Sequence, residues 1–414
     1  MQHYLSKIKK IKNKFGKFNH SEIDNVLNVL DNSNTDYVKK LESLFCKIFK
    51  VKYAIACNSG TSGLHSALAA LNLKKDDEVI VPGLTVVMDA YAALHLGATP
   101  IFADVDEETY LITADTIKKK LSKRTKAIIV VSLQGLPVDI DPIMKLAKSR
   151  GIAVIEDNAQ DMLGTYKGKI SGTNGHISVW SFENKKHLSG ATEGGMITTN
   201  SKKFAEKIRK FSGIGYKNMT ASGGRTSLSI SMVQDPNYER FDTVGLNYRM
   251  PQIVAAVCYA QLKDSKKIVK RRIEVAKYFS RAIKESKILV QQKKPKNTKH
   301  SHYTFASRLI DSKKVKWKEL YNIYKLKTGH GFYGACVCPH LEPSIKQHMR
   351  RIGCYNCKKV SKNCFCTKKN YLPVAEKIQK QILQFKTNYR DLDLAKKNAN
   401  ILKNILKKIE SESK

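Results

Sequence analysis

The sequence has few acidic residues and no long apolar run. Its 414 residues include 36 Asp and Glu but 74 Lys and Arg, which gives a formal net charge of +38 at pH 7. No apolar stretch approaches the roughly 18–20 residues that a membrane helix needs, so we expect no membrane span. The N-terminus is basic but lacks the apolar core of a secretory signal. A cytoplasmic protein is therefore the default expectation.

The surplus of positive charge has several explanations. It is compatible with a nucleic-acid or anionic-surface partner, with a lysine-rich composition, and with an anionic substrate such as a nucleotide sugar. The basic residues are spread along the chain, and no RNA- or DNA-binding motif accompanies them. We therefore do not expect a nucleic-acid partner, although a non-catalytic basic regulator remains an alternative.

Composition and pattern both indicate a globular α/β protein. Apolar residues make up 42% of the chain and charged residues 27%, which is the balance of a folded chain. From Tyr53 onward, short apolar runs alternate with helical stretches, and the runs YAIAC, EVIVP, AIIVV and IAVIED have the continuous apolar character of strands buried on both faces. This alternation predicts a mainly parallel sheet with crossover helices.

The length predicts two or three domains. We expect an N-terminal helical segment over residues 1–36, a large domain over 37–262, and a smaller C-terminal α/β domain over 263–414. Near the last boundary, QLKDSKKIVKRRIEVAKYFSRAIKES predicts one long connecting helix, and HYTFASRLI further on predicts a strand.

Six of the nine cysteines lie close together, in an insertion near residues 336–366. In a chain without a secretory signal, clustered cysteines indicate metal ligands before disulfides. A structural zinc site is one interpretation, although the CxC pair is tighter than the usual zinc knuckle; free or partly buried thiols are the alternative. The expected ligands are Cys354, Cys357, Cys364 and Cys366, with Cys336, Cys338 and His340 as alternative ligands.

Four short motifs in the expected large domain contain the residues of chemical interest. NSGTSG follows a strand and opens a helix, where free N–H groups attract phosphate. VIEDNAQ places Asp157 at the carboxyl end of a strand, where open α/β sheets bind ligands. SFENKKH, followed by EGGM, places lysines near a strand end, where one can form a Schiff base, and GLNYRM is a loop before a helix. Alone, each motif has a simpler explanation: helix capping for the first two, a solvated surface lysine for the third, and an ordinary loop for the fourth.

Together and in this order, the four motifs resemble the DegT/DnrJ/StrS-type sugar aminotransferases. The similarity runs from about residue 37 to 265, with a looser similarity at YLPVAEKI, and the spacings Asp157 to Gln160 and Ser181 to Lys186 match that family. The resemblance implies the aspartate-aminotransferase fold (PLP-dependent transferase fold type I), with a mainly parallel seven-stranded sheet in the large domain. It also implies pyridoxal 5'-phosphate (PLP) as cofactor and a homodimer with shared active sites.

The same resemblance implies three roles in the chemistry. Lys186 would hold PLP as a Schiff base and, once released, would move a proton as a neutral amine, which requires a lowered pKa. Asp157 would pair with the pyridine nitrogen and keep it protonated, so that the ring accepts electrons. Gln160 would contact the ring near its phenolic oxygen. We choose Lys186 over the adjacent Lys185 because of its spacing from Ser181.

The remaining cofactor contacts are also implied by the resemblance. Gly60, Thr61 and Ser181 would bind the phosphate, and Asn247 would reach the phosphate in the neighbouring subunit. Val86 stands where the family often has an aromatic residue stacked on the ring, so it would cover less of the ring face.

The implied activity is transfer of an amino group, with L-glutamate as the expected donor, to a nucleotide-linked keto-deoxysugar. Arg225 and Arg249 are candidates for binding the diphosphate of the substrate, with capping or surface ion pairing as the alternative. Relatives that carry histidine in place of the lysine are dehydratases, so Lys186 favours transamination, and a nucleotide-sugar dehydratase is the alternative. The sequence identifies neither the sugar, nor the nucleotide, nor whether C3 or C4 is aminated.

Overall fold

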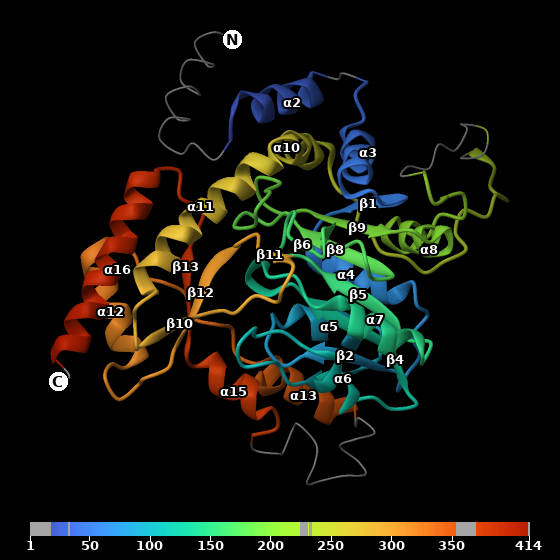
Figure 1. Cartoon of the computed structure of the whole chain (residues 1–414). Helices are drawn as coiled ribbons and strands as arrows, with labels where there is room; N and C mark the ends of the chain where they lie inside the picture. Colours follow the sequence, from blue (N-terminus) through green and yellow to red (C-terminus); the bar gives the residue numbers. More distant parts are fainter. Residues whose placement is uncertain (1–17, 32–33, 224–230, 232–233, 353–369, 413–414) are drawn as a thin grey trace.

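The structure is a computed structural model that describes residues 18–31, 34–223, 231, 234–352 and 370–412 (Figure 1). Its elements, in chain order, are α2 (His20–Leu30), α3 (Tyr37–Phe49), β1 (Tyr53–Cys57), α4 (Gly60–Ala69), β2 (Glu78–Pro82), α5 (Met88–Leu94), β3 (Thr99–Ala103), α6 (Ala114–Lys118), β4 (Thr125–Val131), η1 (Leu133–Gly135), α7 (Ile140–Lys148), β5 (Ala153–Asp157), β6 (Thr165–Tyr166), β7 (Lys169–Ile170), β8 (Ile177–Ser181), β9 (Gly195–Thr199), α8 (Lys202–Ser212), α10 (Gln252–Lys263), α11 (Ser265–Ile283), β10 (Leu289–Gln291), β11 (Thr298–Lys299), β12 (Thr304–Leu309), α12 (Trp317–Thr328), η2 (Pro339–Leu341), α13 (Pro343–Ile352), α15 (Pro373–Gln379), β13 (Ile382–Lys386) and α16 (Leu392–Glu412). In this described part of the chain, no helix combines the length and the apolar character needed to cross a membrane.

A seven-stranded sheet forms the centre of the larger part of the molecule, in the order β1-β9-β8-β5-β4-β2-β3. The neighbours from β8 to β3 pair in parallel, whereas β9 runs antiparallel to both β1 and β8. The expected mainly parallel seven-stranded sheet is therefore confirmed. The apolar runs mark its strands because both faces of the sheet are buried, and β2, β3 and β9 are buried at every position.

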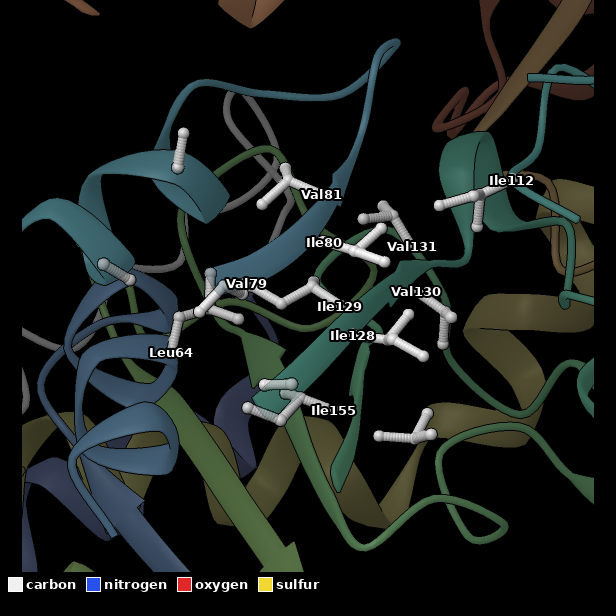
Figure 2. Packing of buried hydrophobic residues seen from close by; sticks show 14 of the residues in the cluster. Leu64, Val79, Ile80, Val81, Ile112, Ile128, Ile129, Val130, Val131 and Ile155 are labelled. Carbon is white, nitrogen blue, oxygen red and sulfur yellow. The ribbon is translucent and has the colours of Figure 1, made fainter. Parts of the chain in front are cut away.

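The middle of this sheet is packed with β-branched side chains. Figure 2 shows Val79, Ile80 and Val81 of β2 beside the side chains of β4, where Ile80 is in register with Ile128. All three β2 residues are completely buried. Branching at Cβ restricts the side chain and suits the extended backbone, so this composition favours strands over helices.

A smaller α/β unit lies beside the sheet (Figure 1). Its three strands form an antiparallel sheet in the order β10-β12-β13, and the strand predicted from HYTFASRLI is present as β12. Its core is a separate apolar cluster in which Phe279 of α11 stacks on Phe385 of β13, with ring centroids 5.1 Å apart. The second α/β domain of the expected fold is thus present, while the exact boundary at residues 262–263 stays a prediction.

We predicted a single long helix before this unit, and this prediction was wrong at one residue. Asp264, with φ −91° and ψ 4°, separates α10 from α11. Its carboxylate accepts hydrogen bonds from Lys267 Nζ at 3.1 Å and from Asn19 Nδ2 at 3.2 Å. Short acidic side chains that bond locally compete with helical geometry, which explains a break that apolar periodicity does not reveal.

A buried ion pair joins the N-terminal helices to the sheet, and it supports a stability prediction. Arg209 of α8 donates to both carboxylate oxygens of Glu42 on α3, at 3.1 and 2.8 Å, and Glu42 also accepts the Ala56 N–H at 2.9 Å. Glu42→Ala would leave a buried guanidinium without its counter-charge. We expect it to lower the free energy of unfolding by about 3–5 kcal/mol.

Urea unfolding followed by circular dichroism measures this change. The matched control is Glu412→Ala, which breaks the exposed Lys408–Glu412 pair (3.5 Å between Nζ and Oε1) and should change stability by less than about 0.5 kcal/mol. Equal effects of the two substitutions would contradict the structural role given to the buried pair.

Candidate active site

Three of the four motifs follow strands that end at one edge of the sheet, and the fourth pairs beside them, where Arg249 is in register with Cys57. Asp157 at the end of β5 is in register with Val131 and Val179 on its neighbours, and Gly195 at the start of β9 is in register with both Cys57 and Ser181. The motifs NSGTSG, VIEDNAQ and SFENKK with EGGM therefore start from adjacent strand ends. Carboxyl ends of parallel strands are where open α/β sheets bind ligands.

Asp157 is a buried carboxylate at this edge, with an exposed fraction of 2%. It accepts a hydrogen bond from the backbone N–H of Ala159 at 2.7 Å. Burial raises the pKa of its carboxyl, while that hydrogen bond and the nearby Lys186 ammonium oppose the shift. A carboxylate held in this way suits pairing with a cation, such as a protonated ring nitrogen.

Lys186 follows β8 and differs from the lysine before it. Lys185 is exposed, whereas Lys186 is partly buried and its Nζ lies 5.0 Å from the ring centroid of Tyr303. Burial lowers the pKa of Lys186, and the Asp157 carboxylate opposes this shift. Lys186 is therefore the lysine whose amine is partly buried and interacts electrostatically with Asp157.

Arg272 of α11 positions the backbone that carries Lys186. Its guanidinium donates to the carbonyl oxygen of Lys186 at 3.1 Å and to that of Tyr303 at 2.8 Å. Burial lowers the pKa of Arg272 to about 10. One buried side chain thus ties the lysine loop to the smaller α/β unit, a role that the sequence analysis missed.

Gly60 and Ser181 form a close-fitting cradle at the start of α4. A Cβ atom on Gly60 would lie 2.8 Å from the Ser181 Cβ, so only glycine fits there. Ser59 caps the helix by accepting the Ser62 N–H at 3.1 Å, and Thr61, in the first turn, is exposed. Close backbone approach and free N–H groups at a helix start suit a phosphate, so the residues present fit the phosphate of PLP.

Gln160 and Val86 lie together on a small cavity of about 30 Å³ between the sheet and the smaller unit. The side-chain oxygen of Gln160 accepts the backbone N–H of Gln134 at 2.8 Å. This bond leaves the Gln160 amide N–H groups as donors, as contact with a phenolic oxygen requires. Gln134 and Cys336 also line the cavity. Gln134 was not predicted as a site residue, and Cys336 was expected only as an alternative zinc ligand.

The fourth motif lies beside the first, since Arg249 is in register with Cys57 and the Tyr248 carbonyl oxygen accepts the Asn58 N–H at 2.8 Å. Asn247 and Arg249 are exposed, Arg249 Nε donates to Asn247 Oδ1 at 3.0 Å, and they line a separate cavity of about 440 Å³. Asn247 thus lines a different cavity from Gln160, and its expected role in a neighbouring subunit stays a prediction. Arg225 lies outside the described residues.

The cysteines expected to bind zinc, Cys354, Cys357, Cys364 and Cys366, lie outside the described residues. Within the described ranges, no group of three or more His, Cys, Asp or Glu side chains is arranged to hold a metal ion. Among the alternative ligands, His340 pairs with Glu376, with 3.0 Å between Nε2 and Oε1, and Cys336 faces the small cavity beside Gln160. Whether they bind zinc together with the other cysteines stays a prediction.

Three histidines lie near the lysine loop, and two of them, His187 and His300, are buried. His187 contacts the carbonyl oxygen of Ser301 at 3.2 Å, and the rings of His300 and His302 stack with centroids 3.8 Å apart. His300 Nδ1 accepts the His302 N–H at 2.9 Å, while its Nε2 faces Gln292 Oε1 at 3.2 Å. Only a neutral His300 satisfies both contacts, and burial holds its pKa well below its usual range.

This geometry predicts that wild type and His300→Gln differ in how their stability depends on pH. Because the folded pKa lies below the unfolded value, wild type loses stability as the pH falls below about 6.5, and the variant does not. The stability advantage of wild type should therefore shrink between pH 7.5 and 5. Thermal unfolding at several pH values measures it.

Buried acids such as Asp161, whose pKa is raised to about 7 by burial, change stability with pH in the opposite direction. They do so in wild type and variant alike, so the quantity to measure is the difference in stability between the two proteins. His20→Asn, at an exposed position, is the control and should show no such trend. A difference that stays constant with pH would show that His300 is not held neutral.

Sheet order, second domain and site chemistry together define a class of enzyme. A mainly parallel sheet whose edge presents a buried aspartate and a lysine, beside a glycine-opened helix, is the arrangement of the PLP-dependent aminotransferases. The predicted enzyme class and cofactor are confirmed by the comparisons that follow.

The chain matches the model of the DegT/DnrJ/EryC1/StrS aminotransferase family over residues 16–385, and it belongs to that family. It is 38% identical to a protein of Escherichia coli O157:H7 named GDP-perosamine synthase, over 272 residues that make up 66% of this chain and 69% of the relative. Its structure resembles an aminotransferase from Psychrobacter cryohalolentis, with a TM-score of 0.80, 27% identity, and coverage of 95% of this chain and 98% of the other. It also resembles a variant GDP-4-keto-6-deoxymannose-3-dehydratase with bound GDP-perosamine, with a TM-score of 0.76, 25% identity, and coverage of 93% and 98%.

Proposed function

We propose that this sugar aminotransferase transfers the amino group of L-glutamate to the keto carbon of a GDP-linked deoxysugar in the cytoplasm. The relative named GDP-perosamine synthase supports the GDP-linked sugar. The observation that carries the proposal is that the carboxyl edge of the sheet brings the buried Asp157 and the partly buried Lys186 near enough for their charges to interact. Glutamate as donor follows from the family resemblance.

The residues of the site divide the work by their chemistry. Gly60, Thr61 and Ser181 hold the cofactor phosphate, and the Asp157 carboxylate holds a proton on the ring nitrogen. When bound, the cofactor supplies the electron sink that stabilises negative charge on the reacting carbon. Burial lowers the pKa of Lys186, so that its neutral amine can act as a base. It would move the proton between the reacting carbon of the substrate and the cofactor.

A homodimer is part of this proposal. The segment that precedes Asn247 exposes large apolar side chains: Phe241 is 52% exposed, Val244 96% and Leu246 41%. Burying them against a second copy would present Asn247, with Arg249 beside it, to the partner's site. Arg249 is then placed to bind the diphosphate of the substrate there.

A dehydratase is the alternative, because a GDP-4-keto-6-deoxymannose-3-dehydratase shares this fold at 25% identity. A dehydratase removes a hydroxyl group from the sugar and leaves no nitrogen on it. Lys186 favours amine transfer, since the family members that act as dehydratases carry histidine instead.

The test is a reaction of the purified protein with PLP, ¹⁵N-labelled L-glutamate and GDP-4-keto-6-deoxymannose, followed by mass spectrometry. We expect a GDP-linked amino sugar that contains ¹⁵N, together with 2-oxoglutarate. A product that lacks one oxygen atom of the substrate and has gained no nitrogen would instead establish the dehydratase. If only keto sugars linked to another nucleotide accept the label, the GDP part of the proposal is wrong.

A further inference from the structure

A second aspartate lies in the active site, and the reaction as described does not use it. Asp89, in the first turn of α5, is completely buried. Its Oδ2 accepts a hydrogen bond from the Thr85 hydroxyl at 2.6 Å, while its Oδ1 has no hydrogen-bond donor. An acidic group in this position needs either a cation or a proton of its own.

The group that faces Asp89 is another carboxyl. The side chains of Asp89 and Asp157 are within hydrogen-bond contact of each other, and the ammonium of Lys186 is the cation that acts on both. Two ionised carboxylates in contact inside a protein repel each other strongly. The contact becomes favourable when one of the two holds a proton and donates it to the other.

The surroundings decide which carboxyl keeps the proton. Asp157 receives the Ala159 N–H at 2.7 Å as well as the attraction of Lys186, and both stabilise its charge. Asp89 receives one hydrogen bond, from the Thr85 hydroxyl, and the attraction of Lys186 is the weakest of the influences on it. Burial and the charge of Asp157 raise the pKa of Asp89 well above its usual range.

We propose that Asp89 is a protonated carboxylic acid that donates a hydrogen bond to Asp157 and so holds the Asp157 carboxylate ionised and aimed at the ring nitrogen of the cofactor. Asp89 is then a positioning residue, because it acts through Asp157. The link to the cofactor rests on the proposed role of Asp157. The proton on Asp89 does not depend on it, since both carboxyls belong to this chain.

The first test uses the apoprotein, so that it is independent of activity. If Asp89 is protonated in the folded state but ionised in the unfolded state, folding takes up one proton, and wild type loses stability as the pH rises. Asp89→Asn cannot take up this proton. The ratio of the folding constants of the variant and wild type should therefore rise about tenfold per pH unit above pH 5, until Asp89 ionises in the folded protein. A ratio that does not change with pH would overturn the proposal.

Infrared spectroscopy of the folded apoprotein keeps the test decisive if unfolding is irreversible. The wild-type spectrum minus that of Asp89→Asn at pH 7 should show the band of a protonated carboxylic acid. A carboxylate band in its place would overturn the proposal. Asp141→Asn is the control, because the ion pair with Lys167 (2.6 Å between Oδ2 and Nζ) holds the pKa of the Asp141 carboxyl below its usual range, so its difference spectrum should show a carboxylate band.

The second test asks whether Asp89 acts through Asp157. With PLP added, Asp89→Ala should shift the pH at which the visible absorbance of the bound cofactor changes, and Asp89→Asn should restore it, because an amide still donates a hydrogen bond. If the absorbance of Asp89→Ala changes with pH as it does in wild type, Asp89 does not influence the cofactor. If no nucleotide sugar is converted although Asp89 proves protonated, the proposed function fails and this inference stands.

Discussion

Lys186→Ala is expected to lose amino transfer by roughly a thousandfold or more, whereas Lys185→Ala keeps wild-type rates within a few-fold. Lys186 is the partly buried amine that interacts with Asp157, and Lys185 is exposed to solvent. Removing Lys186 takes away both the covalent attachment of the cofactor and the group that moves the proton. Rates of 2-oxoglutarate formation from L-glutamate measure the loss.

A second measurement separates attachment from catalysis. After borohydride reduction of the holoenzyme, the mass of the cofactor should remain on the peptide that contains Lys186, and the Lys186→Ala protein should carry none. Thermal unfolding of both apoproteins serves as the control for folding. Equal losses of activity in the two variants, or the cofactor mass on Lys185, would contradict the assignment that the spacing from Ser181 supports.

Much of the fold could be predicted because it follows from local pattern. Strands buried on both faces need continuous apolar runs, and the runs that end at Cys57, Val131 and Asp157 became β1, β4 and β5. The break at Asp264 was not predicted, because apolar periodicity continues across it and the cause is a polar side chain with distant partners such as Asn19.

The site could be predicted only in part, for a similar reason. Asp157 and Lys186 stand in motifs whose order indicates a family. Asp89 and Arg272 act through partners that are distant in sequence. Asp89 lies 68 residues from Asp157, and Arg272 lies 86 residues from Lys186. Asp89 did leave a signal, since it is the one acidic residue in the apolar stretch VVMDAYAAL, where a charge needs an explanation.

The motif VIEDNAQ contains two adjacent carboxylates with different surroundings. Side chains alternate between the two faces of a strand, so Glu156 and Asp157 of β5 point in opposite directions. Glu156 accepts backbone N–H groups of the loop before β8, from Gly172 at 2.9 Å and Asn174 at 2.8 Å. It therefore closes a loop, whereas Asp157 faces Lys186.

Neutralising each carboxylate separately should accordingly give opposite results. Asp157→Asn is expected to lower kcat by about 10²–10³-fold with little loss of stability, because an amide cannot hold a proton on the ring nitrogen. Glu156→Gln should keep kcat but lower the free energy of unfolding by about 1–3 kcal/mol, because its new NH₂ group faces backbone donors and leaves at least one of them without an acceptor. Steady-state kinetics and urea unfolding of the two variants measure these effects. If Glu156→Gln lost kcat and Asp157→Asn lost only stability, the side of β5 that faces the chemistry would have been assigned wrongly.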